Sequence, residues 1–149
     1  MRSSFGSKDR EFLDGSALFL APMAGYTSAP FRFICFEFGA DFAVTEMVSA
    51  EGLVRGGLKT KRLIERMAGE GPVGVQIFGS NPETMARAAC FAAESSPAFI
   101  DLNFGCPVRK VIRKNGGVAL MRDLELMGRI CESVSKEVDL PVTAKIRSG

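Results

Sequence analysis

The sequence predicts an α/β fold of the TIM (β/α)8-barrel type, truncated here to about five βα units. Five short apolar runs alternate with stretches of helical periodicity, and right-handed crossovers between such strands give a parallel sheet. An open doubly wound sheet has the same pattern, but it needs a glycine-rich fingerprint directly after the first strand. Residues 22–26 read PMAGY and lack that fingerprint, which favours the barrel.

The predicted strands are near-continuous apolar runs bounded by turn residues. Runs of four to seven residues suit strands that are buried on both faces, as in a parallel sheet. The five predicted strands span residues 17–21, 42–45, 72–78, 98–104 and 141–146.

The predicted helices begin and end at recognisable capping residues. Pro30 suits a first helical turn and Gly39 a C-terminal cap. Asn81 before Pro82, and Asp123 before a run of apolar residues four apart, are typical N-terminal signals. The four predicted helices span residues 30–38, 59–67 (short and charged), 82–95 and 124–138.

A complete barrel needs eight βα units and about 250 residues. This sequence has 149 residues and ends at Gly149, directly after the fifth predicted strand. We therefore expect a polar N-terminal segment at 1–16 and the N-terminal part of a barrel at 17–149.

Composition excludes several classes of function. The sequence has no histidine, which removes Ser-His-Asp and Cys-His catalysis and HExxH zinc sites. Its four cysteines form no CxxC, so we expect no metal site and no disulfide framework, but free thiols in a reducing cytoplasm. Neither a signal-peptide core nor an apolar run of membrane-spanning length is present, and we expect a cytoplasmic protein without a membrane partner. The formal charge of +2 is too small to indicate a partner.

Polar residues interrupt the apolar pattern where the predicted strands end. Function sits at the carboxyl ends of strands in both candidate folds. Gln76, Asn103 and Lys145 could each satisfy a separate hydrogen bond inside the barrel, but their occurrence on three successive strands favours one shared polar pocket. Asp101 lies on the same strand face as Asn103 by the two-residue period. The full set of such residues is Glu46, Gln76, Asn103, Cys106, Lys145 and Arg147.

Cys106 differs in its setting from the other cysteines. Gly105 permits a tight turn and Pro107 ends the strand, which places the thiol at the mouth of the sheet. Without a histidine or another visible base, this thiol is poorly equipped as a nucleophile. A thiol that is largely protonated at neutral pH can act as a general acid. Cys35, Cys90 and Cys131 fall within the predicted helices and are interpreted as packing residues.

A basic run follows Cys106 at residues 108–117. It contains Arg109, Lys110, Arg113 and Lys114 without one acid, and it is either a solvated surface or a phosphate-contacting loop beside the active site. The segment 56–60 is not a nucleotide-binding P-loop, because Leu58 stands where a glycine must precede the lysine.

Five stretches of the sequence resemble the tRNA-dihydrouridine synthase family. They occur in the family's order and read LAPMAG (20–25), TEMVSA (45–50), VQIFG (75–79), DLNFGCPV (101–108) and KIR (145–147). The resemblance covers residues 17–149 and implies an FMN-binding TIM barrel, which in this family is normally followed by a helical domain that helps to hold tRNA. It implies flavin-dependent reduction of uridine in tRNA, with NADPH as the reductant.

The resemblance also implies roles for individual residues. Hydride would pass from the reduced flavin to C6 of uracil, and Cys106 would protonate C5. The flavin would be held by Pro22, Met23 and Ala24, largely through their backbone, and by Gln76 and Lys145. Asn103 would position the base or the flavin edge, with Arg147 near the same pocket. The loop that contains Arg109 and Lys110 would contact tRNA phosphates.

Two alternatives to this function stay open. The chain could be a related FMN barrel that reduces a free pyrimidine, although the basic run argues against a substrate without phosphates. It could also be a non-catalytic half-barrel that binds RNA. We expect catalysis to need the strands and the helical domain that are absent from these 149 residues.

Overall fold

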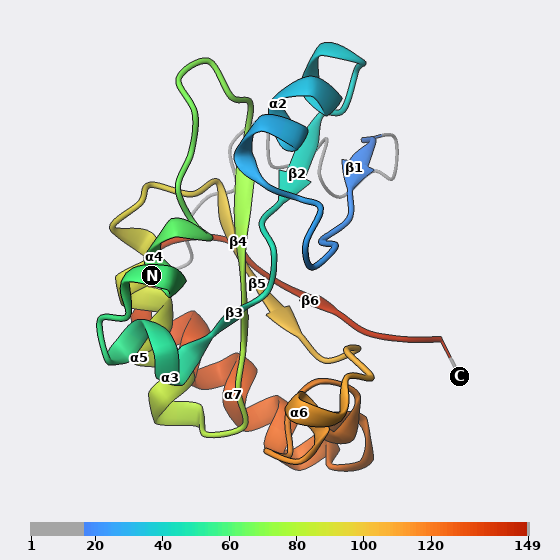
Figure 1. Cartoon of the computed structure of the whole chain (residues 1–149). Coiled ribbons are helices and arrows are strands. Elements are labelled where there is room, and N and C mark those ends of the chain that lie inside the picture. The colour runs from blue at the N-terminus through green and yellow to red at the C-terminus, as the bar shows by residue number, and fades with distance from the viewer. Residues whose placement is uncertain (1–16, 149) are drawn as a thin grey trace.

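A computed structural model describes residues 17–148, which form a parallel α/β half-barrel (Figure 1). Every strand pairing in its sheet is parallel, in the order β1-β2-β4-β5-β6, with the short β3 also paired to β4. The strands are β1 (Phe19–Leu20), β2 (Phe42–Val44), β3 (Val48–Ser49), β4 (Val73–Phe78), β5 (Phe99–Asn103) and β6 (Val142–Lys145). All five predicted strands are present, and the predicted fold class is confirmed.

The helices cover one face of this sheet. The helix α5 packs against both α7 and α3, and together with the strands they enclose the main apolar core (Figure 1). The helical elements are α2 (Ala29–Glu37), α3 (Ala50–Val54), α4 (Leu58–Arg62), α5 (Pro82–Ala93), α6 (Arg109–Ile112), the 3-10 turn η1 (Gly117–Arg122) and α7 (Leu124–Glu137).

The two long helices start at the predicted caps. Asn81 Oδ1 accepts a hydrogen bond from Thr84 N at 2.8 Å ahead of α5, and Asp123 Oδ1 accepts one from Leu126 N at 2.9 Å ahead of α7. Each cap satisfies a backbone N–H that lacks a partner within its helix, which typically stabilises a helix by about 1 kcal/mol.

Strand alternation divides the buried residues of β4 and β5 into two faces. Val75, Ile77, Ile100 and Leu102 point to the helices and are fully buried in the core. Gln76, Asp101 and Asn103 belong to the opposite face, because side chains alternate along a strand. The same face carries an aromatic cluster further toward the amino ends of the strands: the Phe19 and Phe42 rings stack at 4.9 Å, with Phe99 edge-on at 6.4 Å.

Two expectations about the region between β2 and β4 are wrong. The predicted helix 59–67 is shorter, because α4 ends at Arg62 and the chain then wraps around the buried Arg32 side chain, which binds Glu65 O. The simple alternation of strands and helices also fails, since β3 and α3 lie between β2 and α4. Ser49 ends β3 and caps α3, its hydroxyl accepting a hydrogen bond from Gly52 N at 3.3 Å.

The basic run after Cys106 is not the predicted loop, since Arg109–Ile112 forms helix α6. The chain then turns back against Cys106 at Gly117, which has φ +59°, and Val118 N donates to Cys106 O at 3.0 Å. A Cβ atom at residue 117 would come within 2.5 Å of Cys106 O. The close approach and the left-handed backbone therefore both require glycine there.

Candidate functional site

A pocket lies where β4, β5 and β6 end, at the carboxyl edge of the parallel sheet. The loops after β1 and β2 and the turn after β5 complete its wall. The structure thus brings Gln76, Asn103 and Lys145 together with the Cys106 thiol. The lining residues are Pro22, Ala24, Met47, Gln76, Asn103, Gly105, Cys106, Pro107, Val108, Lys145 and Arg147.

A continuous chain of hydrogen bonds crosses the three strands at the base of this pocket. Thr143 Oγ1 donates to Asp101 Oδ1 at 2.6 Å, and Gln76 Nε2 donates to Asp101 Oδ2 at 2.5 Å. Asn103 Nδ2 then donates to Gln76 Oε1 at 2.8 Å. We call Thr143, Asp101, Gln76 and Asn103 the amide chain. Its members Asp101, Gln76 and Asn103 are all buried, so these bonds are shielded from water.

Asn103 joins the amide chain to the turn that carries Cys106. Its Oδ1 accepts from Cys106 N at 3.0 Å and from Gly105 N at 3.3 Å, a side-chain mimic of a backbone turn. From the other side, Arg147 Nε donates to Gly105 O at 2.6 Å. The backbone on the N-terminal side of Cys106 is therefore held by side chains from β5 and from the segment after β6.

Asp101 is the ionisable group at the centre of the amide chain. Burial raises the pKa of this carboxyl above its ordinary value, because the charged form loses hydration. The hydrogen bonds from Thr143 and Gln76 and the positive charge of Lys145 act in the opposite direction without cancelling that effect.

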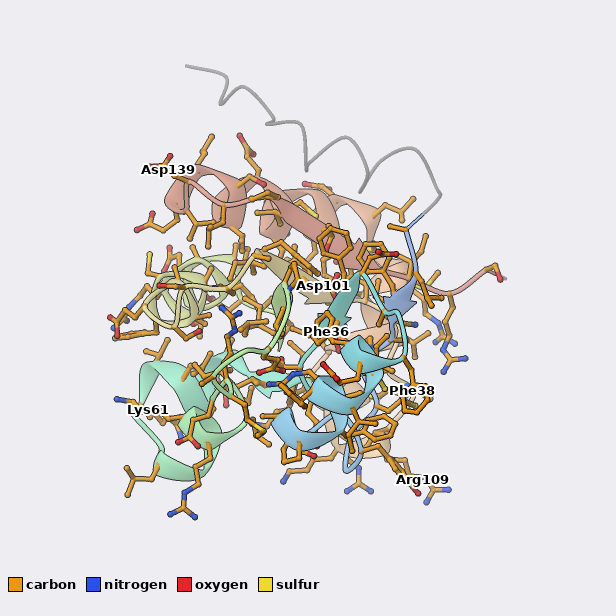
Figure 2. All side chains as sticks on the ribbon, turned by 90° about the horizontal axis from the view of Figure 1, so that it is seen from above. Phe36, Phe38, Lys61, Asp101, Arg109 and Asp139 are labelled. Atoms are coloured by element: carbon orange, nitrogen blue, oxygen red, sulfur yellow. The ribbon has the colours of Figure 1, made fainter. Side chains whose placement is uncertain are left out.

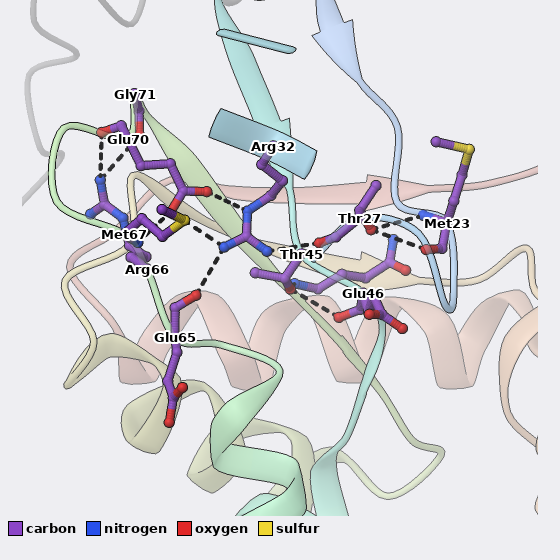
Figure 3. Close-up of polar contacts among 11 residues, drawn as sticks. Met23, Thr27, Arg32, Thr45, Glu46, Glu65, Arg66, Met67, Glu70 and Gly71 are labelled. Carbon is purple, nitrogen blue, oxygen red and sulfur yellow. Dashed lines mark hydrogen bonds and ion pairs between the residues drawn. The ribbon is translucent and has the colours of Figure 1, made fainter. Parts of the chain in front are cut away.

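The loop after β1 is held by polar contacts along its backbone (Figure 3). Glu46 Oε2 accepts from Gly25 N at 2.5 Å, and Thr27 Oγ1 accepts from Met23 N at 3.1 Å. Thr27 Oγ1 also donates to Met23 O at 3.2 Å. Both polar backbone groups of Met23 are therefore used within the turn, whereas Pro22 and Ala24 line the pocket.

A second buried network lies behind this loop and is built around Arg32 (Figure 3). The Arg32 side chain is 1% exposed and pairs with Glu70, its Nε lying 2.5 Å from Glu70 Oε1. Its Nη1 donates to Thr27 O at 2.8 Å and its Nη2 to Glu65 O at 2.9 Å. Arg32 thus ties α2 both to the loop after β1 and to the loop after α4.

Some residues predicted to belong to the site lie outside the pocket lining. Met23 is 40% exposed. Arg109 and Lys110 are exposed on α6, and Figure 2 places Arg109 at the rim of the molecule while Asp101 lies near its centre in that view. The basic run contains no acidic residue of its own, but the fold brings Glu51 to it, and Lys114 Nζ pairs with Glu51 Oε2 at 2.8 Å.

Sequence reasoning missed three contributors to the site: Met47, Thr143 and the central role of Asp101. The shared strand face of Asp101 and Asn103 was the available signal for Asp101. Thr143 could have been found only from the strand register, in which Asp101 pairs with Thr143 and Asn103 with Lys145.

The remaining cysteines and other potential ligands lie apart from the pocket lining. Cys35, Cys90 and Cys131 are half-buried free thiols, and Cys90 Sγ lies 3.5 Å from Glu137 Oε1. Within residues 17–148, no three His, Cys, Asp or Glu side chains gather where they could hold a metal ion. None of the helices in that part of the chain has the length and apolar character needed to cross a bilayer.

Comparison with known proteins gives one consistent result. The family model described as dihydrouridine synthase (Dus) matches residues 19–149. The chain is 44% identical over 138 residues to the probable tRNA-dihydrouridine synthase of Treponema pallidum (strain Nichols), covering 89% of this chain and 41% of that protein. It is also 44% identical over 135 residues to tRNA-dihydrouridine synthase B of Vibrio vulnificus (strain CMCP6), with the same coverage.

A third relative, the probable tRNA-dihydrouridine synthase of Aquifex aeolicus (strain VF5), is 45% identical over 134 residues, covering 87% of this chain and 42% of that protein. The chain thus spans about two fifths of the length of these curated relatives. The family match nevertheless extends over nearly all of it and includes every strand of the half-barrel. The chain therefore belongs to the dihydrouridine synthase family.

Proposed function

We propose that residues 17–149 form the N-terminal part of an FMN-dependent barrel that reduces uridine in tRNA to dihydrouridine. The observation that carries this proposal is the pocket at the carboxyl edge of the sheet. There, the Cys106 thiol shares one cavity with the Gln76 and Asn103 amides and with Lys145. The relatives named as tRNA-dihydrouridine synthases support the same substrate.

The residues around the pocket fit a flavin ring in their chemistry. An isoalloxazine has apolar faces and one polar edge. Pro22, Ala24 and Met47 give the pocket an apolar wall, while Gln76 and Lys145 give it amide and ammonium groups for the polar edge. Gln76 Nε2 has two hydrogens and donates one to Asp101, which leaves the second for a ligand. Gln76 and Lys145 would hold the ring edge, with the Lys145 cation favouring negative charge on it.

The proposed chemistry needs a neutral acid on the substrate side. FMN, when bound, supplies the hydride that adds to C6 of the uracil ring, and NADPH serves as its reductant. As negative charge develops toward C5 and the C4 carbonyl oxygen, Cys106 Sγ transfers its proton to C5. The Asn103 and Arg147 contacts to the turn fix the backbone that carries the thiol, which general acid catalysis requires.

A tRNA substrate must present its uracil outside the base stack. The half-buried Cys106 lies at the mouth of the pocket, and α6, which carries the exposed Arg109 and Lys110, follows it in the chain. These cations would contact backbone phosphates near the extruded nucleotide, supplying affinity and not sequence selection. A free pyrimidine offers no such phosphates, so the position of α6 favours the tRNA substrate over that alternative.

FMN titration of the purified 149-residue chain, followed by flavin fluorescence, tests the cofactor site. We expect saturable binding that is lost in the double variant Gln76→Ala/Lys145→Ala. The matched control is the single variant Lys136→Ala, in which Gln76 and Lys145 are unchanged. It removes an exposed lysine on α7 that is paired with Glu132. Binding that survives in the double variant would contradict the assignment of these two residues.

A second titration with tRNA separates the enzyme from the non-catalytic RNA-binding alternative. Salt-sensitive tRNA binding in a chain without any affinity for FMN would favour the binding module. Turnover of free uracil that does not depend on tRNA would favour the pyrimidine reductase.

A further inference from the structure

We propose that Asp101 is a positioning residue: its carboxylate is the acceptor that completes the directed chain of the Gln76 and Asn103 amides, and it thereby helps to hold the turn that carries Cys106. The inference deepens the proposed function, on which its catalytic meaning rests.

The backbone determines which way round the Asn103 amide lies. Cys106 N and Gly105 N both direct their hydrogens at one end of that amide, at 3.0 and 3.3 Å. Backbone N–H groups only donate, so this end must be the Asn103 carbonyl oxygen. The nitrogen, Nδ2, is then at the other end and faces Gln76.

The Asn103 amide in turn determines the orientation of the Gln76 amide. Asn103 Nδ2 is a donor, so it requires the Gln76 carbonyl oxygen opposite it, at 2.8 Å. The Gln76 nitrogen must then face Asp101, at 2.5 Å. A reversed Gln76 would set two NH2 groups against each other in a site where Gln76 is 1% and Asn103 7% exposed, with no room for hydration to compensate.

The chain of donors therefore has to end on a group that accepts. An ionised carboxylate accepts at both oxygens, and Asp101 receives Gln76 at Oδ2 and the Thr143 hydroxyl at Oδ1. Thr143 can donate or accept, so it adapts to Asp101 and does not dictate the direction. Asp101 is thus the residue that makes one orientation of the amide chain favourable from β6 across to the Cys106 turn.

The orientation matters for what the pocket presents. It places the Gln76 nitrogen on the Asp101 side of the Gln76 side chain, and the second hydrogen of that nitrogen remains for a ligand. It also keeps the Asn103 oxygen on the two N–H groups of the turn. Loss of the acceptor at residue 101 would leave Gln76 Nε2 without its buried partner, and a Gln76 amide that rotates would no longer accept from Asn103 Nδ2. The support that Asn103 gives to the Cys106 turn would then weaken.

Two substitutions of similar size separate the acceptor from the charge. Asp101→Asn keeps a carbonyl oxygen for Gln76, and its new NH2 group can donate to the Thr143 hydroxyl, which then accepts. Asp101→Leu removes every acceptor. If Asp101→Leu fails to fold, Gln76→Met breaks the same chain one residue later while keeping the side-chain length.

The measurement is hydrogen exchange of the Cys106 and Gly105 amides by NMR on the 149-residue chain, with the amides of α7 as an internal reference. We expect protection of the Cys106 amide to fall by about tenfold in Asp101→Leu and in Gln76→Met, the effect of losing one hydrogen bond. Asp101→Asn should restore most of it. Reference amides in α7 should not change, which a general loss of stability would not permit.

Unchanged protection of the Cys106 amide in both Asp101→Leu and Gln76→Met would overturn the inference. Equal losses in Asp101→Asn and Asp101→Leu would overturn it too, because charge and not the acceptor would then be responsible. The exchange readout needs no flavin. Absence of FMN binding by the wild-type chain would therefore count against the proposed function while leaving the test of Asp101 intact.

Discussion

Residues 17–148 contain two buried polar networks that differ in what they face. The Arg32 network binds Glu70 and two backbone carbonyl oxygens, and none of Arg32, Glu70 or Glu65 lines the pocket. The amide chain has equally short contacts, but Gln76 and Asn103 lie in the wall of the pocket. Burial and satisfied hydrogen bonds are common to both networks, so these properties alone do not identify a functional site.

The difference lies in what each network supports. Arg32 holds the loop after β1 from behind, through Thr27 O, and so acts on the site only by shaping the backbone. The amide chain reaches both the ligand-facing amide of Gln76 and the turn that carries Cys106. We therefore expect changes in the Arg32 network to act mainly on stability, and changes in the amide chain to act mainly on the pocket.

The largest expected effect on stability comes from Arg32→Met. This variant leaves Glu70 as a buried charge without its cation, which typically costs about 3–5 kcal/mol. Urea denaturation measures the loss, and Arg129→Met, which removes an exposed i,i+4 pair with Glu125, is the matched control with almost no expected change. An unfolding midpoint for Arg32→Met equal to that of the wild type would show that the Arg32–Glu70 pair does not hold the loops after β1 and α4.

A smaller effect is expected behind the Cys106 turn. Gly117→Ala places a methyl group against Cys106 O at a residue with φ +59°, and should lower the free energy of unfolding by more than about 1 kcal/mol. Gly128→Ala is the control. A Cβ atom at residue 128 would have no neighbouring atom outside its own helix within 4 Å, so alanine should stabilise α7 by about 0.4–1 kcal/mol. Equal effects at both positions would contradict the close packing of the turn.

The smallest effect concerns pH and separates the two networks further. The pKa of Asp101 is raised by burial, so the native state binds its proton more tightly than the unfolded state does. The contribution of Asp101 to stability is therefore present at pH below its ordinary value of 3.8 and is lost as the pH rises through the raised pKa. The free energy of unfolding of wild type, measured relative to Asp101→Asn, should fall over that interval. A rising difference would contradict the dominance of burial.

Much of the fold could be predicted because local signals and burial agree. The clearest signals were the apolar runs of strands β4 and β5 and the N-terminal caps of helices α5 and α7. The structure places these four elements within two residues of the predicted bounds. The short elements could not be predicted. The two residues of β3 are a strand only because Val48 pairs with Ile77, and α4 ends where the loop turns to Arg32.

The site was predictable to the level of residue types at strand ends, but not to the level of their contacts. Polar residues interrupting apolar strands indicated a shared pocket. The hydrogen bonds that join the members of the amide chain connect residues 25 to 42 positions apart in the sequence, and those pairings exist only once the strand register is known. The ion pair of Lys114 could not be predicted for the same reason, since its partner Glu51 lies 63 residues earlier.

The most direct test of the proposed site measures dihydrouridine in tRNA after reaction with a chimera. In it, this chain replaces the matching segment of the Vibrio vulnificus tRNA-dihydrouridine synthase B. The wild-type chimera is the reference, and Cys131→Ala, which changes a half-buried thiol in α7, is the matched control. Cys106→Ala should slow dihydrouridine formation by about 10²–10⁴-fold, the usual loss when a general acid is removed, while FMN binding is retained. Dihydrouridine formation by Cys106→Ala at the rate of the wild-type chimera would contradict the account.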